Sequence, residues 1–134
     1  MLKVVIGVFL ILHGGVHLLY AGHSLRLFEL QPELPWPDGA WAFTRPLGQK
    51  ATRVFTAVSL ALVAAGFIAS GVAMFSGFGW FKQVVMTTAW VSTGLYFLLW
   101  NGELETVDDQ GAGGILINLI ILAAQGIFNW PPVG

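Results

Sequence analysis

At 134 residues, with 56% hydrophobic and only 10% charged side chains, the chain is too apolar for a soluble domain, in which about a quarter of the residues are charged. A net charge of −1 without a basic cluster gives no reason to expect a nucleic-acid partner. Since cysteine is absent, disulfides, thiolate nucleophiles and cysteine-ligated metal sites are excluded.

Four segments are long and apolar enough to be membrane-spanning helices, each of which needs roughly 20 apolar residues. They cover residues 2–22, 50–75, 81–100 and 113–130. The charged residues lie outside these segments or near their ends, as the cost of a charge at mid-bilayer requires. We therefore expect an all-α fold, in which residues 1–134 form a single integral membrane domain: an antiparallel bundle of four transmembrane helices surrounded by the lipid bilayer.

The first segment carries all three histidines of the chain within it or just beyond it, at His13, His17 and His23. An ionisable residue at membrane depth is costly and by default marks a site. His13 and His17 are one helical turn apart and Tyr20 follows three residues later, so the three share one stripe. A cleaved signal peptide is the alternative for this segment, but the apolar run continues to Tyr20 and lacks a good cleavage site.

The connection between the first two helices, residues 23–49, is long and rich in proline. Its prolines are Pro32, Pro35, Pro37 and Pro46. They rule out a continuous helix. Trp36 and Trp41 lie between them, and indole rings favour the headgroup level of a membrane. We therefore expect a segment at the membrane surface that serves as a lid or docking surface, or only as a tether.

The second segment carries a seam of small and hydroxylated residues at alternating steps of four and three. The seam consists of Thr52, Thr56, Ser59, Val63, Gly66 and Ser70. Small residues allow helix backbones to approach closely in a membrane. The seam therefore predicts a helix-packing face.

Further polar stripes occur in the last two segments. Thr88, Ser92 and Tyr96 follow one another at steps of four, and Asn118 and Gln125 are seven residues apart. Buried polar groups need partners, so these stripes and the histidine stripe are expected to converge. Convergence would produce either a polar pocket inside the bundle or a set of hydrogen bonds that hold the helices together.

We predict a ligand-binding pocket lined by His13, His17, Tyr20 and Asn118. We expect the ligand to be a quinone or a lipid, because such a molecule needs only one hydrogen-bond donor and an apolar slot in the protein. Haem is not expected, since bis-histidine haem normally takes ligands from two helices and every histidine here belongs to one. Acid–base catalysis suits the pKa range of imidazole, but no partner carboxylate lies within the membrane, so no catalytic residue is assigned.

Metal binding is the remaining alternative for the polar residues. Histidines at positions i and i+4 can share a zinc ion, but further ligands would have to come from His23, a loop or another chain. The acidic connection before the fourth helix offers Glu103, Glu105, Asp108 and Asp109. Negative charge at that place is explained by the dipole at the start of a helix, so we predict no metal site.

The opening GVFLILHGGVH, residues 7–17, resembles that of the DoxX-like group of small bacterial and archaeal membrane proteins. The last helix is similar to theirs in placement and character, with GGILINL at residues 113–119. The resemblance implies a protein of a prokaryotic cytoplasmic membrane, linked to membrane redox systems as a small subunit near quinone chemistry.

From these patterns we expect a non-catalytic accessory or ligand-binding subunit of a membrane complex, assembled as a homo-oligomer or with other membrane subunits. The first alternative is an intramembrane enzyme that modifies a lipid or quinone with a histidine as acid or base. The second is a purely structural packing subunit.

Overall fold

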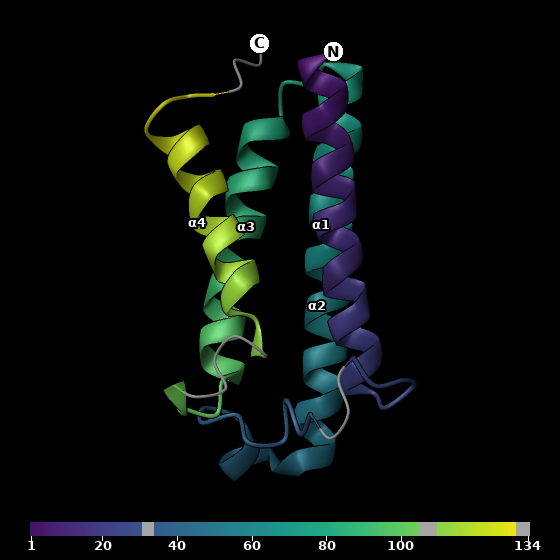
Figure 1. Cartoon of the computed structure of the whole chain (residues 1–134), viewed down its shortest axis with the longest axis vertical. Coiled ribbons are helices and arrows are strands. Elements are labelled where there is room, and N and C mark those ends of the chain that lie inside the picture. The colour runs from purple at the N-terminus through teal and green to yellow at the C-terminus, as the bar shows by residue number, and fades with distance from the viewer. Residues whose placement is uncertain (31–33, 105–109, 131–134) are drawn as a thin grey trace.

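The computed structural model describes residues 1–30, 34–104 and 110–130, and these residues form four α-helices and no strand. The helices are α1 (Leu2–Ser24), α2 (Thr44–Ser76), α3 (Phe81–Leu99) and α4 (Ala112–Gly126). Figure 1 shows two antiparallel pairs side by side, α1 with α2 and α3 with α4. The predicted all-α class and the four-helix arrangement are confirmed. Of the acidic connection, Glu105, Asp108 and Asp109 lie outside the described residues.

Two helix boundaries differ from the prediction. α2 begins at Thr44 rather than at residue 50, because one helical turn precedes a kink at Gly48, whose φ is 81°. α4 ends at Gly126 rather than at residue 130. Beyond that end the backbone turns at Asn129, with φ 49°, and the Trp130 N–H donates to the Ala124 carbonyl at 2.8 Å. The chain therefore folds back onto the last turn of α4.

α1 and α2 pack closely because glycines remove side chains from their contact. A Cβ atom on Gly71 would lie 2.6 Å from the Gly7 carbonyl oxygen, and one on Gly14 would lie 2.9 Å from the Ala64 carbonyl oxygen. The predicted seam of α2 is buried or half-buried along its whole length. Close backbone contact of this kind is how helices associate where there is no water to drive them together.

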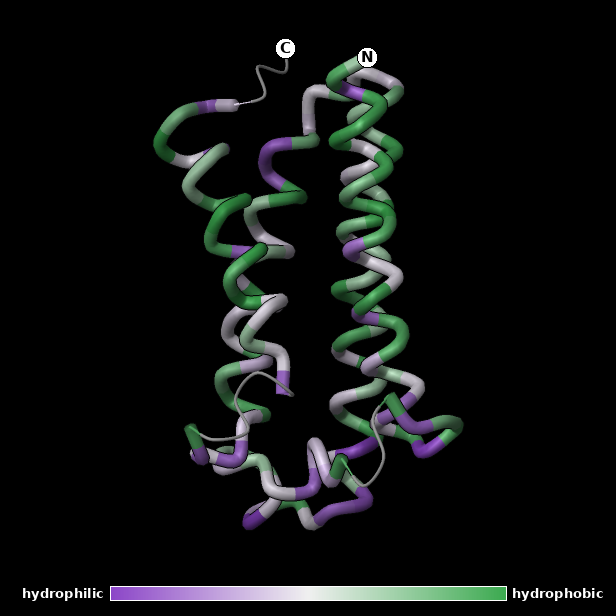
Figure 2. The backbone as a smooth tube through the Cα atoms, viewed as in Figure 1, coloured by the Kyte–Doolittle hydropathy of each residue, from purple (hydrophilic) through white to green (hydrophobic). Residues whose placement is uncertain are grey.

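The outer faces of the helices are apolar. Exposed side chains on α1 include Val5, Leu12 and Leu19, and on α2 Val58 and Leu62. Figure 2 shows apolar residues along the helices, with polar ones concentrated in the connections at the end opposite the amino terminus. Among the described residues, α1 and α2 are each long and apolar enough to cross a membrane, whereas α4 is apolar but short.

The connection between α1 and α2 crosses one end of the bundle and is held by an ion cluster. The Arg26 guanidinium donates to the backbone carbonyls of Pro35 and Trp36, and to the Asp38 carboxylate at 3.1 Å. Arg53 of α2 donates to the same carboxylate at 2.6 and 2.5 Å. Burial raises the pKa of Asp38, but the hydrogen bonds from Arg53 and the charges of both arginines outweigh it, so this pKa lies below its ordinary value of 3.8.

Trp36 is buried beneath this connection. Its ring lies 5.2 Å from that of Tyr20, 6.1 Å from that of Tyr96 and 6.4 Å from that of His23, centroid to centroid. Trp36 is therefore enclosed by an aromatic cluster at the end of the bundle, and its location at headgroup level stays a prediction. Trp41 remains half exposed, and its indole N–H donates to the Phe97 carbonyl.

Candidate functional site

The polar stripes of α1, α3 and α4 converge near the middle of the bundle. His13 Nε2 lies 2.8 Å from Asn118 Oδ1, and Asn118 Nδ2 lies 2.7 Å from Ser92 Oγ. The same Ser92 hydroxyl lies 2.7 Å from His17 Nε2. His17 Nδ1, in turn, lies 2.8 Å from the backbone carbonyl of His13. All four side chains are buried. The predicted convergence of the stripes is thus observed, and Ser92 joins the predicted residues.

These four hydrogen bonds form a closed ring in which each donor has one acceptor. The His13 carbonyl can only accept, so His17 carries its proton on Nδ1, and Nε2 of the neutral ring accepts from the Ser92 hydroxyl. Ser92 Oγ accepts from the Asn118 amide nitrogen, which leaves Asn118 Oδ1 to accept from His13 Nε2. Among the described residues, no carboxylate pairs with either ring. Hydrogen bonds that run in one direction around a ring strengthen one another.

The ring lies between two apolar clusters and touches both. The His13 and His17 rings lie 4.6 and 5.1 Å from Phe67 of α2, which belongs to the cluster nearer the amino terminus. His17 also lies 5.5 Å from Tyr96, which belongs to the other cluster. All four helices therefore meet at this layer, and the polar ring connects the α1–α2 pair to the α3–α4 pair.

The structure places Tyr20, the third residue of the histidine stripe, and the third histidine, His23, outside the ring. Tyr20 is half-buried one turn farther along α1 and packs against Trp36 and Tyr96. His23 accepts a hydrogen bond from the Leu30 backbone N–H on Nδ1. His13, His17 and Asn118 thus come together as predicted, whereas Tyr20 belongs to the aromatic cluster at the end of the bundle. The geometry is that of the hydrogen-bonded inter-helix contact, and ligand binding at these four residues stays a prediction.

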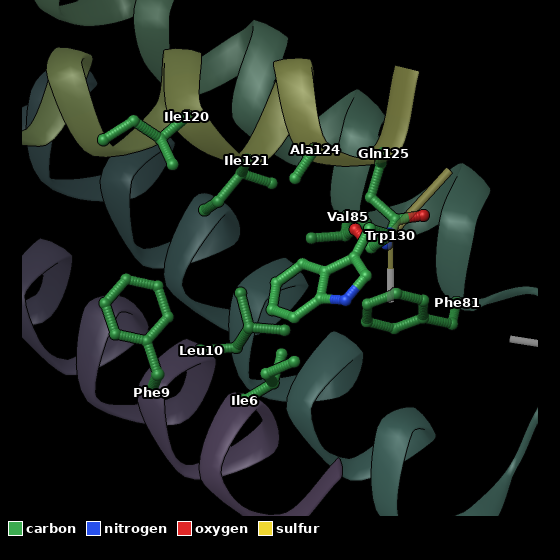
Figure 3. Close-up of a pocket in the computed structure, with 10 residues that line it drawn as sticks. All are labelled: Ile6, Phe9, Leu10, Phe81, Val85, Ile120, Ile121, Ala124, Gln125 and Trp130. Carbon is green, nitrogen blue, oxygen red and sulfur yellow. Dashed lines mark hydrogen bonds between the residues drawn. The ribbon is translucent and has the colours of Figure 1, made fainter. Parts of the chain in front are cut away.

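A cavity of about 130 Å³ lies elsewhere, at the seam between α1 and α4, with α3 as its floor. Its lining comprises Ile6, Phe9, Leu10, Phe81, Val85, Ile120, Ile121, Ala124, Gln125 and Trp130. Figure 3 shows the side chains of α1 and α4 facing one another across the cavity. The Trp130 indole lies among these side chains, next to Phe81. Leu10 of α1 and Val85 of the α3 floor are buried, whereas Phe9 and Ile120 at the mouth are exposed. The cavity therefore opens sideways between α1 and α4.

The segment after α4 closes one end of this cavity. The Gln125 amide donates to the Trp130 carbonyl at 2.8 Å, and the Lys82 ammonium donates to Asn129 Oδ1 at 2.9 Å. These bonds hold the Trp130 indole over the cavity at the same end of the bundle as the amino terminus. The sequence prediction of a helix to residue 130 placed Trp130 on the helix and so missed this arrangement.

A second hollow lies between α2 and α3. It has a volume of about 280 Å³ and a more polar lining than the first, which includes Ser59, Thr87 and Thr88. Thr88 also fills the space beside Gly66, where a Cβ atom would lie 2.4 Å from its hydroxyl. This hollow is therefore a gap in the packing of the α2 seam against α3.

Apart from Gln125, which belongs to the predicted polar stripe of Asn118, the cavity residues carried no signal in the sequence, because they are ordinary apolar side chains. Ser92 did carry one, since it belongs to the stripe of Thr88 and Tyr96. Among the described residues, no group of three or more His, Asp and Glu side chains is arranged to hold a metal ion. Comparison of the chain with protein-family models, with curated proteins and with solved structures finds no match.

Proposed function

We propose that the chain is an integral membrane protein with four membrane-crossing helices that binds the hydrocarbon chain of a lipid or quinone in the cavity between α1, α3 and α4, without catalysing a reaction. The observation that supports this most directly is the cavity itself, which is lined almost wholly by apolar groups and opens sideways. Its role as a subunit of a larger membrane complex, its homo-oligomeric state and the DoxX-like resemblance stay predictions.

Four crossings are supported by the arrangement of the helices. α3 and α4 lie alongside α1 and α2 (Figure 1), so a bilayer crossed by the first pair surrounds the second pair at the same depth. α3 has 19 residues, which is close to the length a crossing requires. α4 has only 15 residues, and short apolar helices are accommodated by local thinning of the bilayer.

Cysteine labelling tests the four crossings, because the chain has no cysteine of its own. Four variants each carry one cysteine at an exposed position: Gln49→Cys, Ser76→Cys, Glu103→Cys and Ile127→Cys. Each variant is treated in sealed vesicles with a membrane-impermeant maleimide. We expect positions 76 and 127 to react from one side and positions 49 and 103 from the other. Reaction of positions 103 and 127 from the same side would show that α4 does not cross.

A binding role for the cavity is supported by the chemistry of its walls. A hydrocarbon chain loses no hydrogen bond when it enters an apolar cavity, whereas water there would have almost no partner. The mouth lies between exposed apolar side chains of α1 and α4, which a bilayer covers with acyl chains. A chain-bearing membrane molecule therefore reaches the cavity without leaving the apolar phase.

Native mass spectrometry tests this binding role. The purified protein is incubated in micelles with phosphatidylcholine or with decylubiquinone, and the bound mass is measured. Ala124→Phe places a ring in the cavity, and Ala61→Phe makes the same change on the exposed face of α2. We expect the bound molecule to be lost from the first variant and retained by the second, with both equally helical by circular dichroism. Equal retention by the two variants would refute the assignment of the cavity.

A further inference from the structure

The two ends of the bundle differ in charge. All seven acidic residues of the chain lie in the two connecting segments 25–43 and 100–111, whose described parts are at the end opposite the amino terminus (Figure 1). The end that carries the cavity holds Lys3 and Lys82. In the described part of the chain the ion pairs are those of Asp38 with Arg26 and Arg53, so neither lysine is neutralised by a carboxylate there.

Both lysines are close in sequence to residues that line the cavity. Lys82 directly follows Phe81 of the cavity floor, and its ammonium bonds to Asn129, the neighbour of Trp130. Lys3 precedes Ile6 by three residues and Leu10 by seven, which places it on the α1 face that lines the cavity. The two lysines therefore lie in the first turns of α1 and α3, at the end of the bundle nearest the cavity.

We propose that the cavity selects an anionic phospholipid, with one acyl chain between α1 and α4 and the phosphate group beside Lys3 and Lys82. This inference rests on the cavity binding proposed above and adds the class of headgroup. An acyl chain matches the apolar walls, and the negative phosphate complements the two cations in the first turns of α1 and α3. Lys82 now donates to the neutral side chain of Asn129. A phosphate oxygen can take the place of the Asn129 oxygen as acceptor, and no charged group then loses its partner, because Asn129 is neutral.

The test compares two lipids that differ only in headgroup charge. The full chain in micelles is incubated with equal amounts of palmitoyl-oleoyl phosphatidylglycerol and phosphatidylcholine, and the retained lipids are quantified by native mass spectrometry. A lysine near an anionic lipid contributes roughly fivefold in binding, so we expect the two lysines together to give a preference for phosphatidylglycerol of roughly 25-fold. The double variant Lys3→Gln/Lys82→Gln should bring the ratio close to unity.

Lys50→Gln is the matched control, since it removes one exposed ammonium at the opposite end of the bundle. We expect it to leave the preference unchanged. Equal retention of the two lipids by the unaltered chain, or an undiminished preference in the double variant, would overturn the headgroup inference while leaving hydrocarbon binding in place. Retention of neither lipid by the unaltered chain would instead remove the proposed cavity function on which the inference rests.

Discussion

The ring of hydrogen bonds at the centre of the bundle makes a quantitative prediction for Ser92→Ala. The Ser92 hydroxyl donates to His17 Nε2 and accepts from Asn118 Nδ2, each at 2.7 Å. In membranes an inter-helix hydrogen bond contributes about 0.6 kcal/mol on average, so the two lost bonds set a lower limit near 1 kcal/mol. If both buried atoms remain without partners, each costs about 1–3 kcal/mol. We therefore expect a loss of unfolding free energy between about 1 and 6 kcal/mol.

Ser70→Ala provides the matched control, because Ser70 is as fully buried as Ser92 but its hydroxyl donates only to the Gly66 carbonyl of its own helix. That change should cost at most about 0.6 kcal/mol. The assay is reversible unfolding in mixed micelles of increasing sodium dodecyl sulfate content, followed by helical circular dichroism. If Ser92→Ala proves no more destabilising than Ser70→Ala, the ring does not couple the two helix pairs.

Two further changes test other contacts. Asp38→Asn should lower the unfolding free energy by about 1–3 kcal/mol at neutral pH, because hydrogen bonds between charged groups are lost. The pKa of Asp38 is lowered in the folded state. The contribution of the Asp38 carboxylate to the unfolding free energy is therefore complete above pH 3.8 and disappears as the pH falls through the folded pKa. The unfolding curves of the two proteins should converge below that pKa, and a difference that stays constant with pH would contradict the ion cluster. Gly71→Ala should lower the unfolding free energy by about 1–3 kcal/mol, since the new Cβ atom meets the Gly7 carbonyl oxygen. Gly15→Ala is the control, because a Cβ atom there has no atom within 4 Å, and it should be neutral or slightly stabilising. Similar effects of the two substitutions would show that α1 and α2 can separate freely.

The four helices were predictable because local patterns define them. Apolar runs of about 20 residues are interrupted only where prolines, glycines and charges cluster. α2 ends at Ser76, one residue beyond the predicted end, and Gly77 follows it with φ 70°. The missed start of α2 reflects the helical turn before the local kink at Gly48, whereas the missed end of α4 depends on a longer-range contact. The turn that ends α4 is fixed in part by the bond of Asn129 to Lys82, 47 residues away, which no local pattern of apolar residues contains.

Much of the central site was also predictable, since a stripe identifies which face of a helix must find polar partners. The spacing of His13 and His17 and the position of Asn118 were enough to expect these residues to meet. The pairing of individual atoms was not predictable, because it depends on the relative height and rotation of α1, α3 and α4. The same holds for Trp36, whose burial follows from the distant contact of Asp38 with Arg53 rather than from its proline-rich surroundings.

The position of the cavity follows from how the helix pairs are joined. Glycines allow close backbone contact between α1 and α2, and α4 packs on α3. α1 and α4 lack close backbone packing. Within the described residues, His13 of α1 and Asn118 of α4 form a hydrogen bond that links the two helices at mid-height. Toward the amino-terminal end, Phe9 and Ile120 are too bulky for close approach and carry no hydrogen-bonding group, so the seam stays open there and the Trp130 indole fills only part of it. The hydrogen-bond network at mid-height therefore fixes the end of the cavity near the middle of the bundle. The turn after α4 fixes the other end, which lies toward the amino terminus.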